Sequence, residues 1–166
     1  MKQPQNPAPA PQSNRKAAAM MECALTLPVL MILVLGILEV GSGLRASTIL
    51  QSACRESGRL TAMDWRYIVH EGQTPNQKVS QDLKNFVTAA GLKGNASTVT
   101  ITHADGDNVG QIFDLADPDN DLQFVRVEVT LPYASVSVFP LTYLAGKTLK
   151  ASVVMRATTK GGSLSN

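Results

Sequence analysis

The chain has 166 residues and a formal net charge of +2, from 15 Lys and Arg residues against 13 Asp and Glu residues. This length suits one modest domain. So small a charge, without a basic cluster, argues against nucleic acid as a partner. The two cysteines, Cys23 and Cys54, belong to no C-x-x-C motif or Cys/His cluster. Composition therefore argues against a disulfide framework or a zinc site, and we expect no cofactor and no resident metal.

Residues 1–16 form a basic leader that is rich in proline and contains no acid. Its charges are Lys2, Arg15 and Lys16, and residues 1–14 include no branched aliphatic side chain. Such a composition cannot bury enough apolar surface to offset the entropy lost on ordering. We therefore expect residues 1–16 to be disordered.

Residues 17–41 are predicted to form a transmembrane helix. Between Ala17 and Leu38 the only charged residue is Glu22. A helix of this length spans roughly 33 Å, and the hydrocarbon core of a bilayer is about 30 Å thick. Basic residues precede the helix, which predicts a cytoplasmic N-terminus and a remainder outside the cytoplasm. A cleavable secretory signal is the alternative, but no A-x-A-like site follows the apolar run.

Residues 42–72 are predicted to continue the helix with one apolar face. Apolar residues recur there at steps of three and four, while most charged residues take the other side. The apolar set is Leu44, Ala46, Ile49, Leu50, Ala53, Cys54, Leu60, Met63, Tyr67 and Ile68.

Residues 73–158 are predicted to form a small α+β domain, followed by a flexible tail at 159–166. Thr74 and Gln77 form a capping box that begins a short helix, which Gly91 ends. Apolar residues then alternate with polar ones, and this pattern predicts half-buried strands at 98–102, 124–131 and 149–158. We expect an antiparallel sheet with one face covered by the short helix and the stripe of residues 44–68.

Six of the 13 acids lie between residues 105 and 121. They are Asp105, Asp107, Asp114, Asp117, Asp119 and Asp121. Oxygen ligands at alternate positions from Asp117 to Asp121 resemble a calcium loop, but the bidentate Glu of an EF-hand is absent. The composition favours a solvated loop over a calcium site.

A membrane-anchored hydrolase is the contrasting hypothesis. It would use His70 or His103 with Asp105 or Asp107, but the sequence holds no nucleophile elbow, H-E-x-x-H or phosphate loop. Isolated histidines near loops are usually surface residues. We expect no catalytic activity.

Three residues in or beside the apolar run need an explanation. Glu22 either marks the membrane edge or is held for a cationic partner, such as the α-amino group that a cut before Ala18 would create. Pro28 removes one helix hydrogen bond and is expected to kink the helix. We expect Glu39 to be solvated at the outer interface.

The segment from Arg15 to Leu25, the Leu27-Pro28 step and the segment from Gly36 to Gly41 resemble TadE-like pseudopilins of tight-adherence (Tad/Flp) pilus systems. Residues 53–59 and the late Leu131-Pro132-Tyr133 and Phe139-Pro140-Leu141 steps also look like that family. The resemblance implies a pilin-like fold and a non-enzymatic minor pilin or pseudopilin that assembles a tight-adherence pilus or related secretion apparatus.

The resemblance also implies partners and a place in the cell. A prepilin peptidase would cut between Ala17 and Ala18, and Glu22 would pair with the new amino group. Other pilin-like subunits and pilus assembly proteins would be neighbours in the bacterial inner membrane or in a surface pilus. The family usually has Gly where this chain has Ala17, so an uncleaved, signal-anchored extracytoplasmic binding protein remains the alternative.

Overall fold

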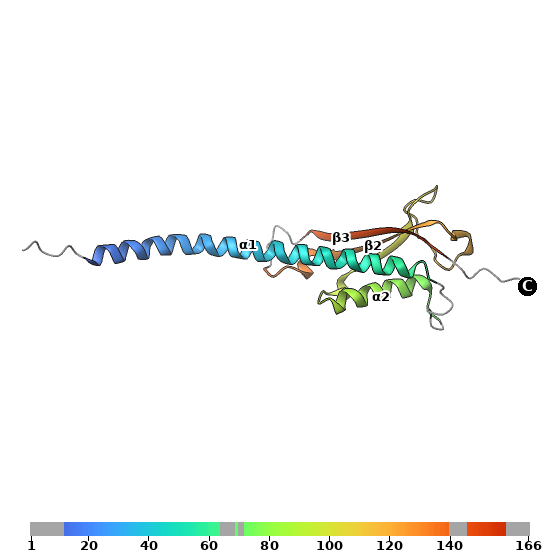
Figure 1. The fold of residues 1–166 in the computed structure, drawn as a ribbon, viewed down its shortest axis with the longest axis horizontal. Coiled ribbons are helices and arrows are strands. Elements are labelled where there is room, and N and C mark those ends of the chain that lie inside the picture. Colours follow the sequence, from blue (N-terminus) through green and yellow to red (C-terminus); the bar gives the residue numbers. More distant parts are fainter. Residues whose placement is uncertain (1–11, 64–68, 70–71, 140–145, 159–166) are drawn as a thin grey trace, which may run out of the picture. The chain divides into compact units, whose positions relative to one another are not determined.

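The computed structural model describes residues 12–63, 69, 72–139 and 146–158. In chain order the elements are α1 (Gln12–Leu60), α2 (Pro75–Ala89), η2 (Gly94–Ala96), β1 (Thr98–His103), η3 (Pro118–Asn120), β2 (Phe124–Pro132), η4 (Tyr133–Ser135) and β3 (Thr148–Arg156) (Figure 1). The chain divides into two compact units, Met1–Leu38 and Glu39–Asn166. The long apolar N-terminal helix with a small α+β domain is the fold class expected from the sequence.

Helix α1 begins at Gln12, within the leader that we expected to be disordered. After Pro11 no proline interrupts the chain until Pro28, and Arg, Lys and Ala are good helix formers, so the helix extends back to Gln12. The expectation of disorder is therefore wrong for residues 12–16. Residues 1–11 and the tail at 159–166 lie outside the described residues.

The first unit presents its apolar side chains outward. Between Lys16 and Leu38 the side chains are exposed, apart from the half-buried Leu35. Met21 and Leu25 are each 78% exposed. Within the described residues, α1 is the helix long and apolar enough to cross a membrane, judged by length and composition.

From Glu39 onward, α1 buries one narrow stripe in the core of the second unit. Ala46, Leu50, Ala53 and Cys54 are almost completely buried. The predicted stripe is correct for these positions but wrong for Leu44 and Met63, which are exposed. Two residues correspond to about 200° around a helix, so Leu44 lies on the opposite side from Ala46.

Helix α1 ends at Leu60, short of residue 72, where we expected the helical continuation to end. The amides of Thr61, Ala62 and Met63 each donate to the carbonyl three residues earlier, which tightens the chain into turns. The Thr61 hydroxyl also donates to Gly58 O at 2.6 Å. Tyr67, Ile68 and His70, which we also considered, lie outside the described residues.

Helix α2 begins and ends with the predicted signals. The Thr74 hydroxyl accepts from the Gln77 amide at 3.2 Å, and the Gln77 side chain accepts from the Thr74 amide at 3.1 Å. Beyond the last helical residue, Gly91 takes a φ of 87°, a conformation that glycine adopts without a steric penalty. The capping box and the glycine stop are confirmed.

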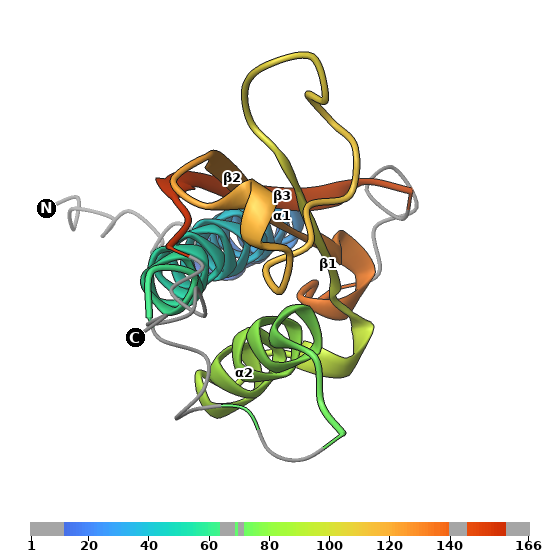
Figure 2. The ribbon, with the colours of Figure 1, turned by 90° about the vertical axis from the view of Figure 1, so that its right-hand side faces the viewer.

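The three strands form an antiparallel sheet in the order β1-β2-β3. Val125, Val127, Val129 and Leu131 of β2 are completely buried, while the residues between them point to the opposite face. Figure 2 shows α2 and the green part of α1 on one side of the strands. The predicted sheet with one covered face is confirmed, and β3 ends at Arg156, two residues before the predicted end.

Two apolar clusters make up the core of the second unit. One joins α1 and α2 to the middle of the sheet and includes Leu50, Leu83 and Val127. The other includes Phe113 and Leu115, which follow β1 and pack with Val79, Ile101 and Val125. The chain after β1 therefore supplies core residues as well as the expected acids.

Candidate functional site

The predicted processing residues lie near the start of α1. Ala17, Ala18 and Glu22 are all exposed on this helix. Ala18 and Glu22 are four residues apart, which places them on one helix face about one turn from each other. A cut before Ala18 would thus leave the new amino group and the carboxylate on neighbouring positions.

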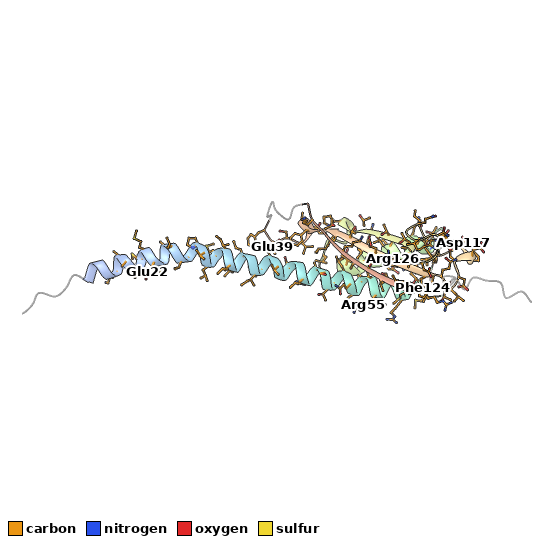
Figure 3. All side chains as sticks on the ribbon, turned by 90° about the horizontal axis from the view of Figure 1, so that it is seen from above. Glu22, Glu39, Arg55, Asp117, Phe124 and Arg126 are labelled. Atoms are coloured by element: carbon orange, nitrogen blue, oxygen red, sulfur yellow. The ribbon has the colours of Figure 1, made fainter. Side chains whose placement is uncertain are left out.

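Glu22 makes no side-chain contact that would explain a charge in an apolar helix. Within the part of the chain that the structure describes, its carboxylate has no hydrogen bond or ion pair, and Figure 3 shows it on the apolar part of α1. The neighbouring Thr26 hydroxyl donates to the backbone carbonyl of Glu22 at 2.9 Å. The side chain itself is exposed on the helix surface.

Pro28 lies inside α1, and the helix continues on both sides of it. Proline has no amide hydrogen to donate to the carbonyl of Ala24. The apolar side chains of Leu25, Leu27 and Val29 surround it on the helix surface and are all exposed. The kink at Pro28 stays a prediction.

Glu39 is buried, so the expectation of a solvated side chain is wrong. Only 3% of its surface is exposed. Its Oε2 atom accepts from the amides of Val138 at 3.1 Å and Phe139 at 3.2 Å. Glu39 therefore fastens the turn after β2 to the first residues of the second unit (Figure 3).

Tyr133 strengthens the same connection. Its hydroxyl donates to the backbone carbonyl of Glu39 at 3.2 Å, and the Ser42 hydroxyl donates to that carbonyl at 2.8 Å. Burial and the adjacent Glu39 raise the pKa of the Tyr133 phenol. A Cβ at Gly43 would lie 3.2 Å from the Tyr133 ring, so glycine lets the ring pack closely against the helix.

The helical period contains a signal that could have identified Glu39. Glu39 lies seven residues before Ala46, and a seven-residue step returns to nearly the same helix face. The buried stripe therefore extends backward to include the acid. The hydrogen-bond partners of Glu39 could not be predicted from this period, because Val138 and Phe139 are about 100 positions away in the sequence.

Within residues 55–59, the small residues Ser57 and Gly58 lie between two arginines and have a packing role. Arg55 and Arg59 are exposed, and Arg59 pairs with Glu56 at 3.2 Å. Ser57 and Gly58 are buried. A Cβ at Gly58 would come within 2.8 Å of Met155 Sδ and 3.0 Å of Val153 Cγ1, so the small residue lets α1 approach β3 closely.

Two of the acids after β1 accept hydrogen bonds from backbone amides of their own loop. The Asp114 carboxylate accepts from the Ala116 amide at 2.9 Å, and the Asp117 carboxylate accepts from the Asp119 amide at 3.0 Å. Among the described residues, no three His, Cys, Asp or Glu side chains come together in a way that could hold a metal ion.

His103 is a core residue, which corrects the expectation of a surface histidine. It is 6% exposed, and its ring lies 4.6 Å from that of Phe113 at a tilt of 52°. Asp105 and Asp107 are exposed on the loop that follows. The structure therefore does not assemble the His103–Asp pair that the hydrolase hypothesis requires.

Comparison with known proteins gives one family. Residues 17–59 match the model of the family described as TadE-like protein, so the resemblance seen in the sequence is confirmed for this segment. The matched segment holds Ala17, Ala18, Glu22, Pro28 and Glu39, and ends at Arg59, directly after the buried small residues. No curated protein and no solved structure matches the chain.

Proposed function

We propose that this chain, whose residues 17–59 match TadE-like proteins of Tad pilus systems, is a membrane-anchored minor pilin or pseudopilin. It assists assembly of a tight-adherence pilus or a related secretion apparatus and catalyses no reaction. The observation that carries the proposal is an exposed apolar helix whose acid near the start, Glu22, has no hydrogen bond or ion pair of its carboxylate among the described residues. The same chain also builds a separate α+β unit.

The apolar helix has two possible neighbours, lipid and other helices. Among the described residues between Lys16 and Leu38, nearly all of its apolar side chains are exposed. In a membrane these side chains would contact acyl chains until they pack against helices of other pilin-like subunits. Lys16 and the other bases of the leader would keep the N-terminus on the cytoplasmic side of a bacterial inner membrane.

In this proposal the carboxylate of Glu22 binds the N-terminus that processing creates. A prepilin peptidase would cut between Ala17 and Ala18 and create a positively charged amino group. Either charge alone is costly in hydrocarbon, whereas a paired amine and carboxylate offset much of each other's desolvation. Glu22 would therefore pair with the amino group of Ala18 in its own chain or in an adjacent subunit.

Genetic complementation tests the proposal in the bacterium that encodes the chain. Deleting the gene should abolish or sharply reduce surface pili counted by electron microscopy, and the wild-type chain should restore them. Glu22→Gln keeps the shape but removes the charge, so it should reach the membrane at normal levels and fail to restore pili. Glu56→Gln is a matched control, because Glu56 is exposed in the second unit. Normal pili in the deletion strain would refute the proposal.

A further inference from the structure

The exposed face of α1 stays apolar beyond the start of the second unit. Leu38 is the last residue of the first unit, and Val40 and Leu44 follow on the same helix, 62% and 65% exposed. Arg45 is the next exposed side chain, and from there to Glu56 every exposed position of α1 is charged or polar. The apolar outer surface of the helix therefore ends at Leu44, six residues after the first unit ends.

Glu39 does not interrupt this surface, because the chain itself covers its carboxylate. The side chain is 3% exposed, and its Oε2 atom accepts from the amides of Val138 and Phe139. An exposed acid at this position would favour water over lipid, because a charge in hydrocarbon is costly. With the acid covered, the outer surface from Ala17 to Leu44 carries no charge apart from Glu22. Measured along the helix this surface is about 42 Å long, and a bilayer with its headgroup layers is about 40–45 Å thick.

The turn after β2 adds an exposed apolar side chain at the level of Glu39. Val138 is 57% exposed, although its amide donates to a buried carboxylate at 3.1 Å. Val40, Leu44 and Val138 thus lie at the same end of the second unit, which we call the apolar end. Exposed apolar side chains that gather in one place mark a surface that another molecule covers.

Charge differs between the two ends of the second unit. The six aspartates between residues 105 and 121 lie between β1 and the start of β2. Glu39 lies beyond the other end of β2, where the Tyr133 hydroxyl donates to its carbonyl, and Figure 3 shows Glu39 and Asp117 at opposite ends of this unit. Lys147 is exposed at the apolar end, and its carbonyl accepts from the Tyr133 amide at 2.8 Å. A base beside exposed apolar side chains suits a phospholipid surface, which offers phosphates above acyl chains.

We propose that the apolar end of the second unit lies in the adjacent headgroup layer of the bilayer that α1 crosses. Val40 and Leu44 would contact the upper part of the acyl chains, and Val138 would lie among the headgroups. Lys147 would extend its ammonium group to lipid phosphates. Lipid is favoured as the occupant because the apolar surface continues from the membrane helix without an exposed charge. The inference rests on the proposed membrane anchor, but not on cleavage of the leader or on the pilus-related role.

Spin labels on single cysteines test this proposal with the full chain, at one copy per nanodisc of phosphatidylcholine and phosphatidylglycerol. The background is Cys23→Ser, and the background chain without an added cysteine measures any label on the buried Cys54. Val138→Cys probes the apolar end. Val109→Cys is the matched control, because Val109 is 54% exposed in the acidic loop, and Leu33→Cys marks the membrane interior. Power-saturation EPR compares collisions of each label with oxygen, which concentrates in lipid, and with a water-soluble nickel chelate.

We expect the oxygen-to-nickel collision ratio to be several-fold higher at Val138 than at Val109, and to approach the ratio at Leu33. Leu44→Cys gives the same comparison on α1 if a label at Val138 disturbs the turn, with Gln51→Cys as its control. A Val138 label that nickel reaches as freely as the Val109 label would overturn the proposal, and a Leu33 label still in lipid would then leave the membrane anchor intact. A Val138 label shielded from both reagents would also overturn it, because protein would then cover the apolar end.

Discussion

At the residue scale, Glu39 joins distant parts of the second unit. Its carboxylate holds two backbone amides of the turn after β2, and its carbonyl accepts from Tyr133. Both hydrogen bonds are partly buried at the Glu39 side, because only 3% of Glu39 is exposed, so removing the carboxylate takes a shared acceptor from two amides of the turn. Glu39 is thus a structural residue within the segment that matches the TadE-like family.

Replacing Glu39 by Ala should loosen the turn after β2. The amides of Val138 and Phe139 lose their common acceptor, so we expect their hydrogen exchange to accelerate by roughly tenfold or more and the melting temperature to fall. Hydrogen exchange with mass spectrometry on the full chain measures this directly. Glu56→Ala is the control, since its exposed ion pair with Arg59 should contribute little. Unchanged protection of Val138 and Phe139 would show that Glu39 does not hold the turn.

Cys54 should react with alkylating reagents only when the second unit opens. Burial raises the pKa of its thiol from 9.0 to about 11, and the thiol donates to Ala151 O at 3.4 Å. At pH 8 the reactive thiolate is therefore rarer by roughly a hundredfold than for an ordinary thiol. The raised pKa favours the protonated, folded form, so its contribution to stability is complete below about pH 9 and is lost as the pH rises through about 11.

The measurement uses the full chain with Cys23→Ser, which leaves Cys54 as the one thiol. Iodoacetamide labelling at pH 8 should be slow in native conditions and fast in denaturant. Labelling that is equally fast in both would mean that Cys54 is not packed against the sheet.

At the element scale, the second unit depends on how closely α1 approaches β3. The side chains of Val153 and Met155 occupy the space in which a Cβ of residue 58 would lie. Helix and sheet therefore meet through a residue that has no side chain.

Replacing Gly58 by Val should push α1 away from β3. Overpacking of this kind usually costs about 1–3 kcal/mol of unfolding free energy. Gly41→Ala is the matched control, because no atom lies within 4 Å of the added Cβ, and alanine favours the helix by about 1 kcal/mol. Chemical denaturation of both variants in detergent compares them. Equal stability of Gly58→Val and the wild type would contradict the close packing.

Local signals predicted most of the elements. The capping box of α2 and the alternation in β2 are each contained within a few residues, and the structure reproduces both. The end of α1 was harder to predict, because the apolar period continues in the sequence beyond Leu60, where the chain tightens into turns whose hydrogen bonds include that of the Thr61 hydroxyl. The buried positions of Glu39 and His103 continue local periods, the seven-residue step to Ala46 and the alternation after Ile101, but their partners, such as Val138 and Phe113, lie elsewhere in the fold and could not be predicted from the sequence.

At the scale of the whole molecule, the two units differ in whether their apolar side chains are covered within the unit. The second unit buries its own apolar clusters, whereas the first leaves nearly all of its apolar side chains exposed. A helix with this exposure needs lipid or other helices around it. The pilus-related proposal explains why one chain contains both, and it assigns the contacts with other subunits to the first unit.

The N-terminal residue of the protein extracted from its native membrane tests this proposal most directly. Mass spectrometry of the intact chain and of its N-terminal peptide identifies that residue. Ala17→Gly serves as the positive control, because it places Gly, the usual residue of the family, directly before the cut. We expect the wild-type chain to begin at Ala18, with Glu22 five residues into the mature protein. A chain that begins at Met1 and remains stably embedded in the membrane would contradict the processed pseudopilin and favour an uncleaved, signal-anchored binding protein.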